Sequence, residues 1–99
     1  MGQVPVQEEA LEYARMGLVP AGMYRNRSFT EERIELGEVE EARMDLFFDP
    51  QTSGGLLISV SPDDGEDILR GLKEAGIGTS FAMIGRVTEP GEKKVRLLP

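Results

Sequence analysis

One seven-residue run carries the groups in this chain best suited to chemistry. Residues 49–55 read DPQTSGG and combine a carboxylate, two hydroxyls and two adjacent glycines, directly before an apolar stretch. Because glycine has no side chain, the backbone at Gly54 and Gly55 can approach an anion closely. The hydroxyls of Thr52 and Ser53 suit the same kind of ligand. The run therefore invites a phosphate-binding interpretation.

The same run also has a purely structural interpretation. It lacks the lysine and the spacing of a P-loop. Phosphate-cradling glycines normally follow a strand and open a helix, which is the reverse of the order in this chain. Turns built from Pro, Gly, Asp and Ser far outnumber ligand loops, so the pattern alone favours a structural turn.

A second candidate is the basic cluster Arg25-Asn26-Arg27. Its guanidinium groups could clamp a carboxylate or a phosphate through paired hydrogen bonds. The alternative is that both arginines counter the acidic stretch from Glu31 to Glu41. The residues alone favour this alternative.

Composition excludes much other chemistry. The chain contains no histidine and no cysteine, so the commonest general base, the commonest metal ligand and thiolate chemistry are absent. We predict no catalytic residue and no metal site within it. Its 18 acidic and 11 basic residues give a formal charge of −7, which disfavours nucleic acid and membrane surfaces as partners. The start MGQVPVQEEA lacks the order of a signal peptide, which predicts a cytoplasmic protein.

The elements that must position these groups follow from periodicity and punctuation. Helical spacing predicts a helix over residues 7–16 that stops at Gly17. Residues 23–29 are predicted as a loop or one short helix. Residues 30–43 show no clean period. The apolar residues 56–60 predict a strand after the DPQTSGG run.

The last part of the chain predicts a helix and a hairpin. Ser61 is expected to cap a helix that runs to Ala75, with Gly76 in the left-handed conformation that closes it. Residues 80–88 and 93–98 flank a Pro-Gly turn and are expected to form a β-hairpin. The predicted class is α+β: a mixed or antiparallel sheet with helices packed on one face, in one domain over residues 1–99.

Several strings resemble the C-terminal part of selenophosphate synthetases (selenide, water dikinases). Residues 49–57 look like that family's DPQTSGGLL signature, and the upstream strings ALEYA, GLVPAG and YRNR are similar to its ALEYA, GLVPGG and YRNR stretch. Residues 82–87, AMIGRV, resemble its closing strand. The chain departs from the family at Ala21 and Met23, where a glycine and a threonine are usual.

This resemblance implies an enzyme that converts ATP, selenide and water into selenophosphate, AMP and orthophosphate, with magnesium on the phosphates. It implies a two-domain fold related to aminoimidazole ribotide synthetase, with this chain as a partial C-terminal domain. The reactive cysteine or selenocysteine, the essential lysine and the metal-binding aspartates of the family lie upstream. The chain is therefore expected to be inactive alone and to hold neither ATP nor magnesium by itself.

The expected partners are the missing N-terminal ATP-binding half, a second copy in a homodimer of the full-length enzyme, and self-association of this piece. The residues expected nearest the active-site cleft are Thr52, Ser53, Gly54, Gly55, Arg25 and Asn26. Two alternatives stay open: a free-standing α+β binding or regulatory module, and another ATP-dependent member of the same superfamily. The sequence also leaves open whether the chain is an engineered truncation, a proteolytic remnant or a split gene product.

Overall fold

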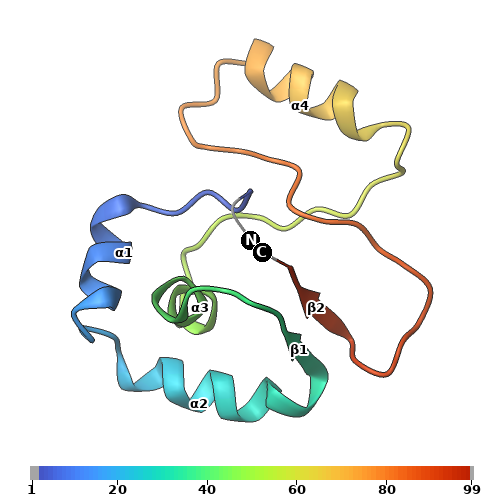
Figure 1. Ribbon diagram of the computed structural model, residues 1–99. Coiled ribbons are helices and arrows are strands. Elements are labelled where there is room, and N and C mark those ends of the chain that lie inside the picture. Colours follow the sequence, from blue (N-terminus) through green and yellow to red (C-terminus); the bar gives the residue numbers. More distant parts are fainter. Residues whose placement is uncertain (1–2, 99) are drawn as a thin grey trace.

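The computed structural model describes residues 3–98 (Figure 1). Its elements, in chain order, are α1 (Glu8–Arg15), α2 (Ala21–Thr30), the 3₁₀ turn η1 (Glu31–Arg33), β1 (Ile34–Leu36), α3 (Glu41–Phe48), α4 (Gly65–Glu74) and β2 (Val95–Leu97). No helix within these residues is both long enough and apolar enough to cross a membrane.

The core lies where α3 packs against both α1 and α2 (Figure 1). One half of it joins Leu11 and Ala14 of α1 to Ala42 of α3. The other half joins Met23 of α2 to two α3 residues, Met44 and Phe48. Because α3 contributes to both halves, it is the element that holds the helical body together.

The first helix confirms its prediction to within one residue at each end. Leu11 and Ala14, on the predicted apolar stripe, are buried. Gly17 ends the helix with a φ of 76°, a conformation that residues with a side chain rarely adopt. The α2 segment, predicted as a loop or short helix, is a ten-residue helix that begins directly after Pro20. Proline favours such a start because its fixed φ suits the edge of a helix.

The sheet confirms the α+β class but not the hairpin. β1 and β2 pair in parallel, in the register Ile34 to Val95, Glu35 to Arg96 and Leu36 to Leu97. Glu35 and Arg96 form an ion pair of 2.7 Å across this register. The carboxyl-terminal strand therefore pairs with a segment about sixty residues earlier. The sheet is parallel where a mixed or antiparallel sheet was expected.

The stretch between α3 and β2 also departs from expectation. Residues 56–60 form no strand among the described residues, and α4 begins at Gly65 instead of after Ser61. A turn occupies residues 61–64 instead, closed by a hydrogen bond of 3.0 Å from the Asp64 N–H to the Ser61 carbonyl. Gly76 does end α4 with a φ of 67°, as predicted. In Figure 1 α4 stands apart from the other helices, so the core does not extend to this region.

Candidate functional site

The DPQTSGG run forms a compact turn attached to the end of α3. The Gln51 side-chain amide donates to the Leu46 carbonyl at 3.2 Å, and the Gly54 N–H donates to the Gln51 carbonyl at 3.1 Å. A Cβ at Gly54 would lie 3.0 Å from the Gln51 carbonyl oxygen, so any other residue there would crowd the turn. The sequence therefore folds this run back on the helix that precedes it.

The start of α2 supports the other side of the turn. A Cβ at Gly22 would lie 2.9 Å from Cγ of Pro50. Only the bare backbone of Gly22 allows Pro50 to come this close. The GLVPAG string thus ends in the residue against which the DPQTSGG turn packs, which explains structurally why the two strings occur together.

An open cleft of about 640 Å³ lies beside the turn. The amino-terminal segment, the start of α1, the end of α3, the turn and Thr79 line it: Val4, Pro5, Val6, Gln7, Ala10, Leu46, Phe47, Asp49, Gln51, Ser53, Gly54, Gly55 and Thr79. A smaller hollow of about 390 Å³ shares Pro5, Val6, Gln7 and Thr79 with it. The apolar residues therefore form much of the wall, while the turn supplies polar groups.

The structure brings together only part of the predicted site. Ser53, Gly54 and Gly55 line the cleft, and Thr52 lies exposed in the same turn without lining it. Arg25 and Asn26 lie on α2 and do not line the cleft. Gly55 makes no hydrogen bond within residues 3–98, so its N–H is open to a ligand, whereas the Gly54 N–H is used by the turn.

Asn26 has a contact of its own. Its side-chain amide donates to the Phe48 carbonyl at 2.8 Å, where the last carbonyls of α3 have no partner within the helix. Asn26 from α2 and Gln51 from the turn thus bind two carbonyls at the end of the same helix. This geometry makes Asn26 a residue that holds the turn in place.

Replacing Asn26 with leucine is expected to lower the free energy of unfolding by about 1 kcal/mol, because the Phe48 carbonyl loses its donor. Urea denaturation of the two proteins measures this difference. Ser28→Ala, on the exposed side of the same helix, is the matched control and should stay within about 0.5 kcal/mol of the parent. Equal stability of the parent and the Asn26 variant would show that this hydrogen bond contributes nothing.

The charges near the cleft do not favour a triphosphate bound by this chain alone. No lysine or arginine is among the lining residues, and Asp49 adds a carboxylate. Phosphate sites generally need cations, either side chains or metal ions, to offset the ligand's charge. In residues 3–98 no group of three or more Asp, Glu, His or Cys residues is placed to hold a metal ion.

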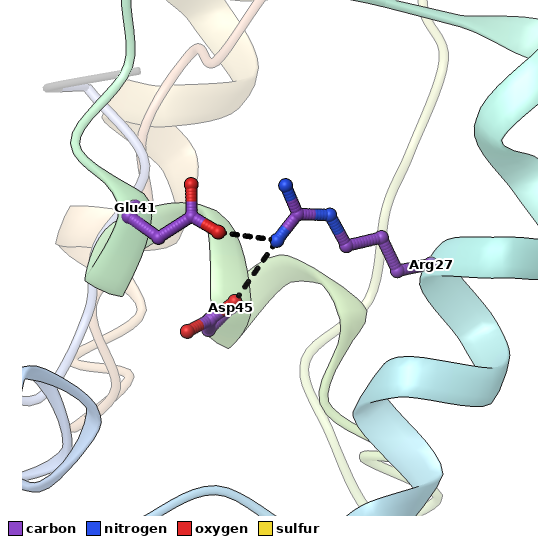
Figure 2. Close-up of polar contacts among 3 residues, drawn as sticks. All are labelled: Arg27, Glu41 and Asp45. Atoms are coloured by element: carbon purple, nitrogen blue, oxygen red, sulfur yellow. Dashed lines mark hydrogen bonds and ion pairs between the residues drawn. The ribbon is translucent and has the colours of Figure 1, made fainter. Parts of the chain in front are cut away.

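Arg27, the other arginine of the basic cluster, pairs with α3. Its guanidinium lies 2.5 Å from the Glu41 carboxylate and 3.5 Å from the Asp45 carboxylate, and Figure 2 shows it pointing toward both. These contacts support the structural interpretation of the cluster for Arg27. Burial raises the pKa of the Asp45 carboxyl, the nearby Glu41 carboxylate raises it further, and Arg27 acts in the opposite direction. The folded state therefore favours the protonated form of Asp45 relative to the unfolded chain.

This shift has a definite sign in stability. A carboxyl whose pKa is higher in the folded state stabilises the fold below its unfolded pKa of about 3.9 and loses that contribution as the pH rises through its folded value. Asp45→Asn, which keeps the side chain neutral, should therefore melt at a higher temperature than the parent at pH 7. The gain should vanish toward pH 3. Thermal melts of both proteins at pH 7 and pH 3 measure this difference in melting temperature. A difference that grows as the pH falls would contradict burial as the cause of the raised Asp45 pKa.

Sequence reasoning missed the amino-terminal wall of the cleft. Val4, Pro5 and Val6 line it, although the predicted elements began at residue 7. The only signal was local: a proline between two valines favours extended backbone with apolar side chains. Phe47 and Thr79 carried no signal at all, because their place in the cleft depends on tertiary packing.

Three similar proteins from different bacteria share one name, selenide, water dikinase. The chain is 43% identical to a selenide, water dikinase of Clostridioides difficile (strain 630) over 96% of its length and 27% of that protein's. The identity is 48% with the selenide, water dikinase of Pelobacter propionicus, over 87% of this chain and 25% of that one. The identity is 44% with the selenide, water dikinase of Treponema denticola, over 95% of this chain and 27% of that protein.

No protein-family model matches the chain. No solved structure matches it significantly. The chain spans about a quarter of the length of the curated relatives that it matches. By sequence, then, the chain is a relative of the selenide, water dikinases and corresponds to about a quarter of such a protein.

Proposed function

We propose that this chain forms the C-terminal quarter of a cytoplasmic selenide, water dikinase, the enzyme that makes selenophosphate from selenide and ATP. The observation that carries the proposal is an alignment at 43% identity over 96% of the chain, which includes the whole DPQTSGG turn. The reaction implied by the family yields AMP and orthophosphate besides selenophosphate. In this proposal, the upstream part of the polypeptide holds ATP and magnesium.

The part assigned to this chain is a wall of the active-site cleft. The cleft beside the turn carries the Ser53 hydroxyl and the unbonded N–H of Gly55, groups that donate hydrogen bonds to anionic ligands. Thr52 lies beside them in the same turn. The absence of lysine and arginine from the cleft lining supports a division of labour in which the other part of the protein offsets the phosphate charge.

The candidates on α2 have different parts in this proposal. Asn26 holds the end of α3, and so the turn, in place through its contact with the Phe48 carbonyl. Arg25 is exposed and forms no ion pair within residues 3–98, which leaves its guanidinium available to an anion brought by the other domain. We further propose a homodimer for the full-length enzyme and self-association for the isolated piece.

The test is release of AMP from ATP by the longest polypeptide that the gene encodes, with and without selenide. The 99-residue chain is assayed beside it at the same molar concentration. Activity that depends on selenide and occurs only in the longer polypeptide is the expected result. An intact, folded long polypeptide that releases no AMP would favour the binding-module alternative.

A further inference from the structure

The cleft beside the DPQTSGG turn has a second polar wall. Thr79, in the loop after α4, lines both this cleft and the smaller hollow next to it. Residues 78–80 together line the smaller hollow. Because the two spaces share Thr79 and residues 5–7, they form one continuous groove that joins residues 53–55 of the turn to residues 78–80.

The polar groups of this second wall have no partner within residues 3–98. The hydroxyls of Thr79 and Ser80 form no hydrogen bond there, and neither do the backbone N–H groups of residues 78–80. All three residues are exposed, and a Cβ at Gly78 would meet no atom within 4 Å. The loop therefore carries several hydrogen-bond donors that this part of the chain does not use.

The end of α4 fixes the point from which the loop starts. The Gly76 N–H donates to the Lys73 carbonyl at 3.1 Å, and Gly76 has a φ of 67°, so the helix ends at a defined residue. From residue 77 to residue 80 the backbone forms no hydrogen bond within the described residues. The loop thus begins at a fixed helix end while its own donors stay free to adapt to a ligand.

Both walls of the groove offer the same kind of group. The turn contributes the Ser53 hydroxyl and the unbonded N–H of Gly55, and the loop contributes hydroxyls and N–H groups. Backbone N–H groups can only donate, so the two walls together favour a ligand with acceptor oxygens, such as a phosphoryl group. No lysine or arginine is among the described residues that line either space. The charge of such a ligand must therefore be offset by groups outside this chain.

We propose that Thr79 and the backbone of residues 78–80 bind the phosphoryl oxygens of a ligand in the cleft, together with Ser53 and Gly55. The inference deepens the proposed function and rests on it for the ligand's place in the reaction. Thr79 contributes a hydrogen bond that binds and orients the ligand. Its loss should therefore weaken binding and raise KM more than it lowers kcat.

The test is calorimetric binding of two probes, ATP with magnesium and orthophosphate alone, to the longest polypeptide that the gene encodes. Thr79→Val keeps the shape of the side chain and removes the hydroxyl, so it should raise the Kd of at least one probe by about 5- to 20-fold. An effect on ATP alone assigns the contact to the nucleotide, and an effect on orthophosphate assigns it to the free anion. Unchanged Kd values for both probes would overturn the inference.

Thr88→Val is the matched control. Thr88 is also exposed, its hydroxyl donates to the neighbouring Glu89 carbonyl at 3.2 Å, and it lines neither space. The same substitution there should leave both Kd values within about twofold of the parent. Thr79→Ser, which keeps a hydroxyl, should bind within about threefold of the parent. If the Ser and Val variants of Thr79 are weakened alike, the hydroxyl is not the binding group and the inference is wrong.

Binding and turnover separate the two proposals. A longer polypeptide that makes selenophosphate, and whose Thr79→Val variant binds both probes like the parent, refutes the role of Thr79 and retains the function. One that releases no AMP with selenide, but binds a probe more weakly in the Thr79→Val variant, refutes the function and retains the site. A folded polypeptide that binds neither probe and releases no AMP refutes both.

Discussion

Replacing Met23 with alanine should lower the free energy of unfolding of the 99-residue chain by about 2–5 kcal/mol. The Met23 side chain is only 1% exposed and packs with Met44 and Phe48, so truncation removes apolar contacts and leaves a cavity between α2 and α3. Domains of this size are stable by only about 5–15 kcal/mol. The variant is therefore expected to unfold at a much lower urea concentration, or to be largely unfolded without urea.

The neighbouring residue provides the control. Tyr24 lies on the same helix with 60% of its surface exposed, and Tyr24→Ala should change the free energy of unfolding by no more than about 0.5 kcal/mol. Urea transitions followed by circular dichroism measure both variants. If the two substitutions cost the same, the interface between α2 and α3 is not the core of the protein.

If the longer polypeptide is the dikinase that we propose, replacing Gly55 with alanine should reduce its selenide-dependent kcat/KM by about 10- to 100-fold without weakening the fold. A Cβ at Gly55 meets no atom within 4 Å, and the residue has no positive φ, so alanine fits this chain without strain. The added methyl group would instead occupy space in the cleft, beside the one glycine N–H of the turn that is open to a ligand.

Two other glycines separate this effect from a general loss of stability. Gly71→Ala, at an open position on α4 outside the cleft lining, should retain parental activity and raise helix stability by about 0.5–1 kcal/mol. Gly54→Ala should lower both activity and melting temperature, because its Cβ would press on the Gln51 carbonyl. A Gly55 variant with parental kcat/KM would remove this backbone from the active site.

Local signals in the sequence were sufficient to predict those elements whose form depends mainly on their own residues. The α1 stripe of Leu11 and Ala14 and the two helix-ending glycines, Gly17 and Gly76, were predicted and confirmed. Each depends on 3.6-residue periodicity or on the conformational freedom of glycine, and neither needs a distant partner. The compact DPQTSGG turn was predicted for the same reason.

Distant pairing could not be predicted in this way. The predicted hairpin assumed that residues 93–98 pair with their neighbours in sequence, whereas Val95 to Leu97 pair with β1 across about sixty residues. Residues 56–60, predicted as a strand, pair with no other backbone within residues 3–98, and a strand exists only where another backbone shares its hydrogen bonds. Helix α3 was missed because acidic residues interrupt its apolar period, although tertiary packing buries Ala42, Met44 and Phe48.

The candidate site was predictable only where its residues are neighbours in the sequence. Ser53, Gly54 and Gly55 reach the cleft because one turn carries them all. Arg25 and Asn26 were grouped with them by residue type, but their place on α2 is set by the packing of α2 against α3, and Asn26 is hydrogen-bonded to α3. Residue type indicated which groups suit an anion, and only the fold indicates which of them face the cleft.

The most direct test of the proposed function is phosphorus NMR of the products formed from ATP by the longest polypeptide that the gene encodes. With selenide present, the proposal predicts selenophosphate, AMP and orthophosphate in equal amounts, and none of the three when selenide or the enzyme is omitted. Hydrolysis of ATP to ADP and orthophosphate regardless of selenide, or no turnover by the folded protein, would contradict the assignment of this chain to a selenide, water dikinase.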